Sequence, residues 1–101
     1  MIRGTTPTHT FGIPISEDKV KTIRVTYRQD DRNVVDKGTE SVQLEGKTAK
    51  VTLTQQETLA FTAGIKAKVK IRVLSTEGQV FSNKKSILIE VDDTFNEEVL
   101  V

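Results

Sequence analysis

The chain has 101 residues, a length that fits a single domain, and its formal net charge is +1. This near-neutral balance gives no general attraction to nucleic acid or to an anionic membrane. The absence of cysteine excludes disulfides, thiolate metal sites and thiol nucleophiles. No apolar run approaches the roughly 20 residues of a membrane-spanning helix, and the first residues lack the apolar stretch of a signal peptide. We therefore expect a soluble product made in the cytoplasm.

The first predicted strand covers residues 9–13, where His9, Phe11 and Ile13 fall on one face. Pro14 has no N–H to donate to a sheet, so we expect this segment at an edge or at a strand end. His9 is the only histidine, and it stands among threonines rather than beside carboxylates. We interpret it as structural, and we name His9 and Phe11 as candidate contacts at the open edge.

Alternation of apolar and polar residues, which is typical of half-buried strands, continues through the middle of the chain. The segments it predicts are a strand at residues 22–28, a hairpin loop at 29–32, strands at 33–36 and 42–44, a glycine turn at 45–47 and a strand at 49–53. Gly46 suits that turn because glycine adopts a positive φ without strain.

One segment, residues 54–61, departs from the alternation. Thr54 and Glu57 match a capping box, in which the threonine hydroxyl and the glutamate carboxylate accept from free N–H groups at a helix start. The pattern predicts a single helical turn that crosses between strands, with Leu59 or Phe61 closing the end of the core.

The clearest alternation covers residues 65–73, where four cations separate apolar residues: Lys66, Lys68, Lys70 and Arg72. A helix would scatter these cations around its circumference, so the pattern predicts a strand with one buried and one wet face. With Arg24 on the same sheet, the cations form a candidate interaction face. We favour a solvated face that resists aggregation, with acids such as Glu90 across the strands, over a nucleic-acid platform, because no aromatic residue alternates with the cations.

The last predicted strand covers residues 87–91, and residues 82–85 interrupt the segment before it as a bulge or loop. The acidic tail, residues 92–101, then holds four acids and no base and ends in apolar residues. Two alternatives stay open for the tail: it docks on a neighbouring subunit or partner, or it is a frayed end. Phe95 and Leu100 are its candidate contacts.

Together these segments predict an all-β chain with antiparallel strands in a two-sheet β-sandwich. The expected architecture is immunoglobulin-like, with about seven strands and one short helical turn near residues 54–61. We expect one domain, residues 1–101, whose last ten residues are the acidic tail.

We expect no catalytic, cofactor-binding or metal-binding residues. Asp30 and Asp31 resemble part of a calcium loop, but Arg32 follows them with a positive charge that repels a cation. The sequence has no glycine-rich phosphate loop, nucleophile elbow or zinc helix. An enzyme is therefore the least favoured class.

Four strings carry a resemblance to a known group: MIRGTTPTHTF (residues 1–11), IRVTY (23–27), VTLTQQET (51–58) and IRVLSTEG (71–78). Together they resemble small proteins of about this length that prophages of Gram-positive bacteria carry among their tail genes. The opening string is the most specific part. The expected fold is also similar to the amino-terminal β domains of phage upper-baseplate proteins, which is an analogy of fold.

The resemblance implies a non-enzymatic structural or protein-interaction module that belongs to a phage tail or baseplate. Its expected partners are other phage tail proteins or further copies of itself, without a small-molecule substrate, cofactor or membrane. The alternative is a non-virion accessory protein, an assembly factor or a host-directed inhibitor, which binds a protein or nucleic acid through the basic strand face. We expect the chain in the host cytoplasm after synthesis and, for a structural role, in the virion tail.

Overall fold

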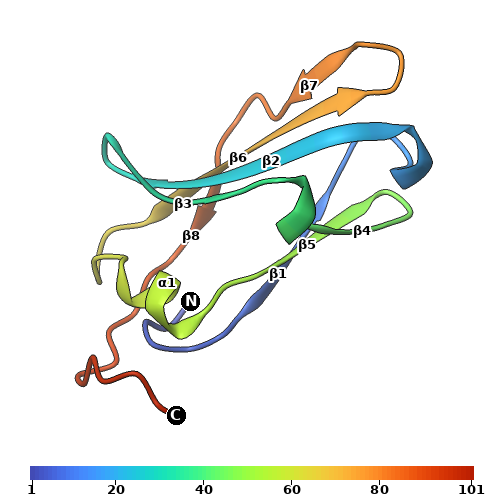
Figure 1. Cartoon of the computed structure of the whole chain (residues 1–101). Helices are drawn as coiled ribbons and strands as arrows, with labels where there is room; N and C mark the ends of the chain where they lie inside the picture. The colour runs from blue at the N-terminus through green and yellow to red at the C-terminus, as the bar shows by residue number, and fades with distance from the viewer.

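The computed structural model describes all 101 residues and consists mainly of two antiparallel β-sheets (Figure 1). The strands are β1 (Thr8–Gly12), β2 (Val20–Gln29), β3 (Arg32–Lys37), β4 (Gln43–Glu45), β5 (Thr48–Thr52), β6 (Ala67–Ser75), β7 (Val80–Ser82) and β8 (Ile87–Ile89). The helical segments are α1 (Gln55–Leu59) and two 3₁₀ turns, η1 (Glu17–Lys19) and η2 (Thr39–Ser41). None of these segments has the length and apolar character that crossing a bilayer requires.

The two sheets differ in width. The smaller sheet has the strand order β1–β5–β4, and the larger has the order β3–β2–β6, with β7 and β8 both paired to the remaining side of β6. In Figure 1 the smaller sheet lies below the larger one, and α1 and both chain ends gather at one end of the molecule.

The structure confirms the mainly β class, the two antiparallel sheets and the single short helix. The strand expected at residues 65–73 starts later, at Ala67, because Ile65 and Lys66 belong to the turn that precedes it. Eight strands form where about seven were expected, because the loop that contains Asn83 divides the last stretch into β7 and β8. These two short strands lie end to end along β6.

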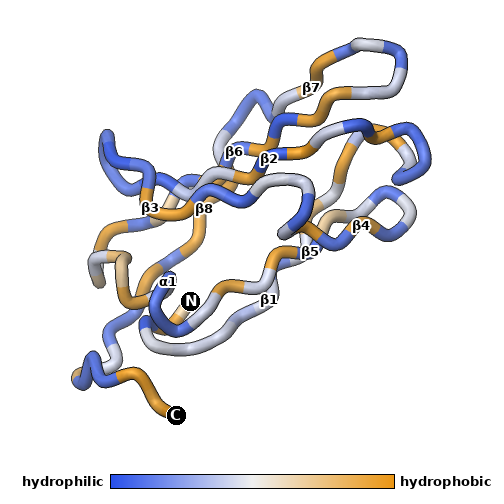
Figure 2. The backbone as a smooth tube through the Cα atoms, viewed as in Figure 1, coloured by the Kyte–Doolittle hydropathy of each residue, from blue (hydrophilic) through white to orange (hydrophobic).

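The core between the sheets contains sixteen buried apolar side chains. Alternate residues of β2 and β6 supply its centre: Ile23, Val25, Tyr27, Ala67, Val69, Ile71 and Val73. Figure 2 shows the same alternation as apolar and polar stretches that follow each other along these strands. Burial of each large side chain contributes about 1.5–3 kcal/mol to folding. The cations between the buried residues of β6 therefore stay on the opposite, wet face.

α1 begins with the predicted capping box. Thr54 Oγ1 accepts from Glu57 N at 3.1 Å, and Glu57 Oε1 accepts from Thr54 N at 2.9 Å. Leu59 stays half-buried, whereas Phe61 is buried and meets Tyr27 edge-on, with ring centroids 6.0 Å apart. Phe61 is therefore the residue that closes this end of the core.

Candidate interaction site

β1 is an outer strand of the three-stranded sheet, and its far edge is open. Ile13 N donates to Lys47 O at 2.9 Å, and Leu53 N donates to Pro7 O at 3.0 Å. Hydrogen-bonded residues alternate along an antiparallel pair, so the odd-numbered residues of this segment direct their backbone groups toward β5. The backbone groups on the free edge belong to Thr8, Thr10 and Gly12. β1 carries no charged residue that would repel an added strand.

The two predicted edge contacts on β1, His9 and Phe11, point into the sandwich. Phe11 is buried and His9 is half-buried. The ring centroids of His9, Phe11 and Tyr27 lie 5.6 to 6.4 Å apart. His9 Nδ1 lies 2.7 Å from Tyr27 Oη. Burial lowers the pKa of His9 and raises the pKa of Tyr27. β1 therefore offers a partner its backbone and its threonines rather than these rings.

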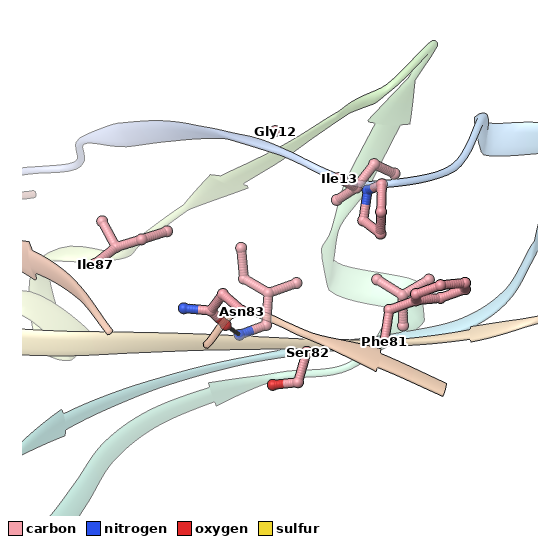
Figure 3. A pocket seen from close by; sticks show the side chains of 9 residues that line it. Gly12, Ile13, Phe81, Ser82, Asn83 and Ile87 are labelled. Atoms are coloured by element: carbon pink, nitrogen blue, oxygen red, sulfur yellow. Dashed lines mark hydrogen bonds between the residues drawn. The ribbon is translucent and has the colours of Figure 1, made fainter. Parts of the chain in front are cut away.

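An apolar groove of about 390 Å³ lies beside the end of β1. Gly12 and Ile13 line one side of it, and Phe81 and Ile87 from β7 and β8 line the other (Figure 3). Ile71 of β6 lies between them. The groove thus opens at the side of the sandwich where β1 ends the smaller sheet.

The groove exists because the inner face of the larger sheet is buried at one margin and partly exposed at the other. At one margin, the inward residue Val35 of β3 is 6% exposed. At the other margin, Phe81, Ile87 and Ile89 each pair with a buried residue of β6, which places them on the inner face. All three are nevertheless only half-buried. The inner surface of β7 and β8 is therefore less covered than that of β3.

A side chain closes the outer margin of β6 at the break between β7 and β8. Asn83 Oδ1 accepts from Ile71 N at 2.7 Å, and Asn83 Nδ2 donates to Val69 O at 3.1 Å and to Lys85 O at 2.8 Å. The amide takes the place of the backbone groups that a continuous strand would supply. The Ile71 N–H and the Val69 carbonyl of β6 therefore both have a hydrogen-bond partner at the break between β7 and β8.

The predicted cations of β2 and β6 share the outer face of the larger sheet. Facing pairs in the β2–β6 register are Arg24 with Arg72, Thr26 with Lys70 and Arg28 with Lys68. Lys66 is exposed, but it precedes β6 and stands beside this face. Like charges that face each other weaken strand pairing unless acids or solvent compensate.

β3 supplies partners for two of these cations, one acid and one neutral amide. Arg24 Nη1 lies 2.8 Å from Asp36 Oδ2, and Arg28 Nε donates to Asn33 Oδ1 at 2.7 Å. Glu90, the acid expected across the strands, lies beyond the end of β8 and forms no ion pair. The strand β8 ends at Ile89, so the expected cross-strand position does not exist.

A polar hollow of about 430 Å³ lies on the same outer face. Its lining contains no apolar residue and consists of Thr26, Arg28, Asp30, Asp31, Asn33, Lys68, Lys70 and Ser86. The hollow has mixed charge, because two aspartates stand among three cations. It therefore has no strong preference for an anion.

The acidic tail lies against α1 of its own chain, an arrangement that neither sequence-based alternative describes. Arg3 joins the two: its guanidinium donates to Phe61 O at 2.7 Å and to Leu59 O at 2.9 Å. The same guanidinium lies 3.0 Å from Asp93 Oδ1 and 2.6 Å from Glu97 Oε1. These ion pairs raise the pKa of Arg3. One arginine thus holds the carbonyl end of α1 and the start of the tail.

Gln55 holds the far end of the tail. Its side-chain amide donates to Leu100 O and accepts from Leu100 N, both at 2.8 Å. The apolar side chains of the tail gain little from this position, because Phe95 is 98% exposed and Leu100 is 73% exposed. The sequence gives no local signal for Arg3 or Gln55, since their partners are distant along the chain.

Comparison with protein-family models, with curated proteins and with solved structures finds no match for this chain. The candidate function therefore rests on the residues and their geometry.

Proposed function

We propose that this chain is a non-enzymatic protein-interaction module that serves as a structural subunit of a phage or prophage tail or baseplate. The observation that carries the interaction role is the open, uncharged edge of β1 beside an apolar groove. Strand addition at such an edge supplies backbone hydrogen bonds, and a groove beside it supplies room for alternate side chains. The phage setting is supported by the resemblance of residues 1–11 and of the other three strings to prophage proteins encoded among tail genes.

The proposal assigns no catalytic role to the single histidine. His9 Nδ1 contacts the Tyr27 hydroxyl inside the sandwich, whereas a catalytic triad holds its histidine against a carboxylate. The proposal includes an immunoglobulin-like arrangement of the sheets. It places the chain in the host cytoplasm after synthesis and in the tail of the assembled particle.

Mass spectrometry of purified phage particles, induced from a strain that carries the gene, tests this role. We expect the chain among the particle proteins, and its absence from particles would contradict a structural role. A Thr10→Pro variant should enter particles less well, because proline removes an N–H at the free edge of β1. Thr10→Val is the matched control, since it keeps this N–H and a β-branched side chain.

The basic outer face favours a second candidate, an accessory protein that stays outside the virion and binds an acidic protein or nucleic acid. Lys68 and Lys70 form no ion pair there. A pull-down from host lysate with Lys68→Glu plus Lys70→Glu should lose the partner in this case. Lys19→Glu plus Lys47→Glu is the control, because it makes the same charge change at two exposed positions elsewhere. A partner that survives the first pair contradicts this alternative.

A further inference from the structure

We propose that the groove beside β1 receives the acidic tail, residues 92–101, of a second copy of this chain, which adds to β1 as one further strand. The inference rests on the proposed function, because it names a partner of the interaction module. The accepting edge and the donating tail are different surfaces. Copies joined in this way therefore associate head to tail.

The space beside β1 suits a single segment rather than the edge of another sheet. Phe81, Ile87 and Ile89 of β7 and β8 extend the larger sheet past β1, and they are half-buried. The rings of β1 pack against Tyr27 of β2, two strands inward from this margin. A second copy that presented its own β1 here would press its projecting β7 and β8 against those of the first. A free tail avoids this clash.

The end of the tail has the side-chain pattern that such a strand needs. Val99 and Val101 fall on one face of an extended segment and Leu100 on the other. The groove lies at the Gly12 end of β1, so the apolar residues 99–101 pair at that end, and the charged Glu97 and Glu98 fall outside the groove. We place Val99 and Val101 toward the groove and Leu100 toward solvent.

Charge complementarity favours the tail as the occupant. The chain has a net charge of +1 and the tail contributes four acids without a base, so residues 1–91 carry +5. Ser82 and Asn83 line the groove, and the same loop continues into Lys84 and Lys85, which are both exposed. Neither lysine forms an ion pair.

The tail is held where it lies by polar contacts and not by buried apolar side chains. Phe95 is 98% exposed and Leu100 is 73% exposed, so the tail buries little apolar surface against its own chain. The tail also leaves the domain beside α1, whereas the groove lies at the end of β1 marked by Gly12. Transfer of the tail to the groove of a neighbouring copy would bury apolar side chains that are now in solvent. The groove of each copy would in turn receive the tail of another copy.

Sedimentation velocity of the full chain over a wide concentration range tests the inference. We expect association of the wild type that weakens about tenfold or more with Val99→Asp, since the charge would enter the groove. Leu100→Asp is the matched control, because it adds the same charge on the opposite face of the strand. Thr10→Pro should weaken association similarly, whereas Thr10→Val should not. Circular dichroism checks that each variant folds.

A mixture of Thr10→Pro and Val99→Asp chains gives the sharpest result. Each variant keeps the surface that the other lacks, so the mixture should form pairs and nothing longer. Association that Val99→Asp leaves unchanged would overturn the inference, since two β1 edges would then pair with each other. A wild type that stays monomeric would also overturn it, while the particle experiment still decides the proposed function separately.

A cysteine pair, Gly12→Cys with Leu100→Cys, places both thiols on the outer face of the added strand and supplies a measurement that does not depend on the proline variant. The chain has no cysteine of its own, so every disulfide is assigned. Oxidation should link different copies into a ladder on a non-reducing gel. A disulfide confined to one copy would show that the tail closes its own groove, and the inference would be wrong.

Discussion

Asn83 Oδ1 accepts the backbone N–H of Ile71 at 2.7 Å, so a side chain completes the hydrogen bonding of β6 in the gap between β7 and β8. Asn83→Ala should lower the free energy of unfolding by about 1–3 kcal/mol, because it leaves the Ile71 N–H and the Val69 carbonyl without partners. Urea unfolding measures the loss. Amide exchange at Ile71 should become faster in the same variant.

Asn83→Asp separates the two halves of this contact. The aspartate keeps an acceptor for Ile71 N and loses the donor to Val69 O, so its stability should fall between the wild type and Asn83→Ala. Equal stability of all three chains would show that solvent replaces the amide at no cost.

Arg3 should control the position of the tail. Its side chain is 11% exposed and binds two carbonyls and two carboxylates, a set that a lysine ammonium does not match in geometry. Arg3→Lys should speed proteolysis within the tail, and Arg3→Ala should also lower the free energy of unfolding by about 1.5–3 kcal/mol. Arg28→Ala is the control, because Arg28 is exposed and bonds only Asn33. Equal cleavage rates in all variants would contradict a role for Arg3.

Local patterns predict most of the fold because strands and caps depend on neighbouring residues. Alternation locates β2, β3, β5 and β6, although β6 starts at Ala67 because the first two residues of the expected run belong to the preceding turn. The capping box at Thr54 is a contact across three residues, and it forms as predicted. The cations fall on one face because the period of a strand is two.

Contacts between distant residues have no local pattern. Arg3 reaches partners 56 to 94 residues away, so the docked tail was not predictable from either segment. The two-residue period of a strand places His9 and Phe11 on one face of β1, but only the position of the opposite sheet decides that this face is the inner one. The groove depends on the relative widths of the two sheets, which the sequence of no single strand contains.

Glu57 should make the free energy of unfolding depend on pH in the acidic range. Its carboxylate accepts from Lys37 Nζ at 2.8 Å and from Thr54 N at 2.9 Å. Burial alone raises the pKa of Glu57, but these hydrogen bonds outweigh burial and hold the pKa below its ordinary value. The folded carboxylate therefore binds a proton less readily than the unfolded one. Its contribution is present above about pH 4.5 and is lost as the pH falls through the lower folded pKa.

Glu57→Gln tests this expectation. The variant should lose about 1.5–3 kcal/mol of unfolding free energy at neutral pH, because Lys37 and Thr54 lose a charged acceptor. The difference from the wild type should shrink near about pH 3, where most carboxylates are protonated. A difference that is the same at both pH values would show that the charge of Glu57 is not its source.

His9 should produce a separate dependence at higher pH. Its imidazole is half-buried on β1, 2.7 Å from the Tyr27 hydroxyl, and burial lowers its pKa. As the pH falls below the ordinary histidine value of about 6.5, the unfolded chain takes up a proton before the folded chain does, so stability falls. The urea midpoint of the wild type should therefore drop between about pH 7.5 and about pH 5.5, a range in which carboxylates stay ionised. His9→Gln should remove this drop, because glutamine does not titrate, and an equal drop in the variant would assign the dependence to other groups.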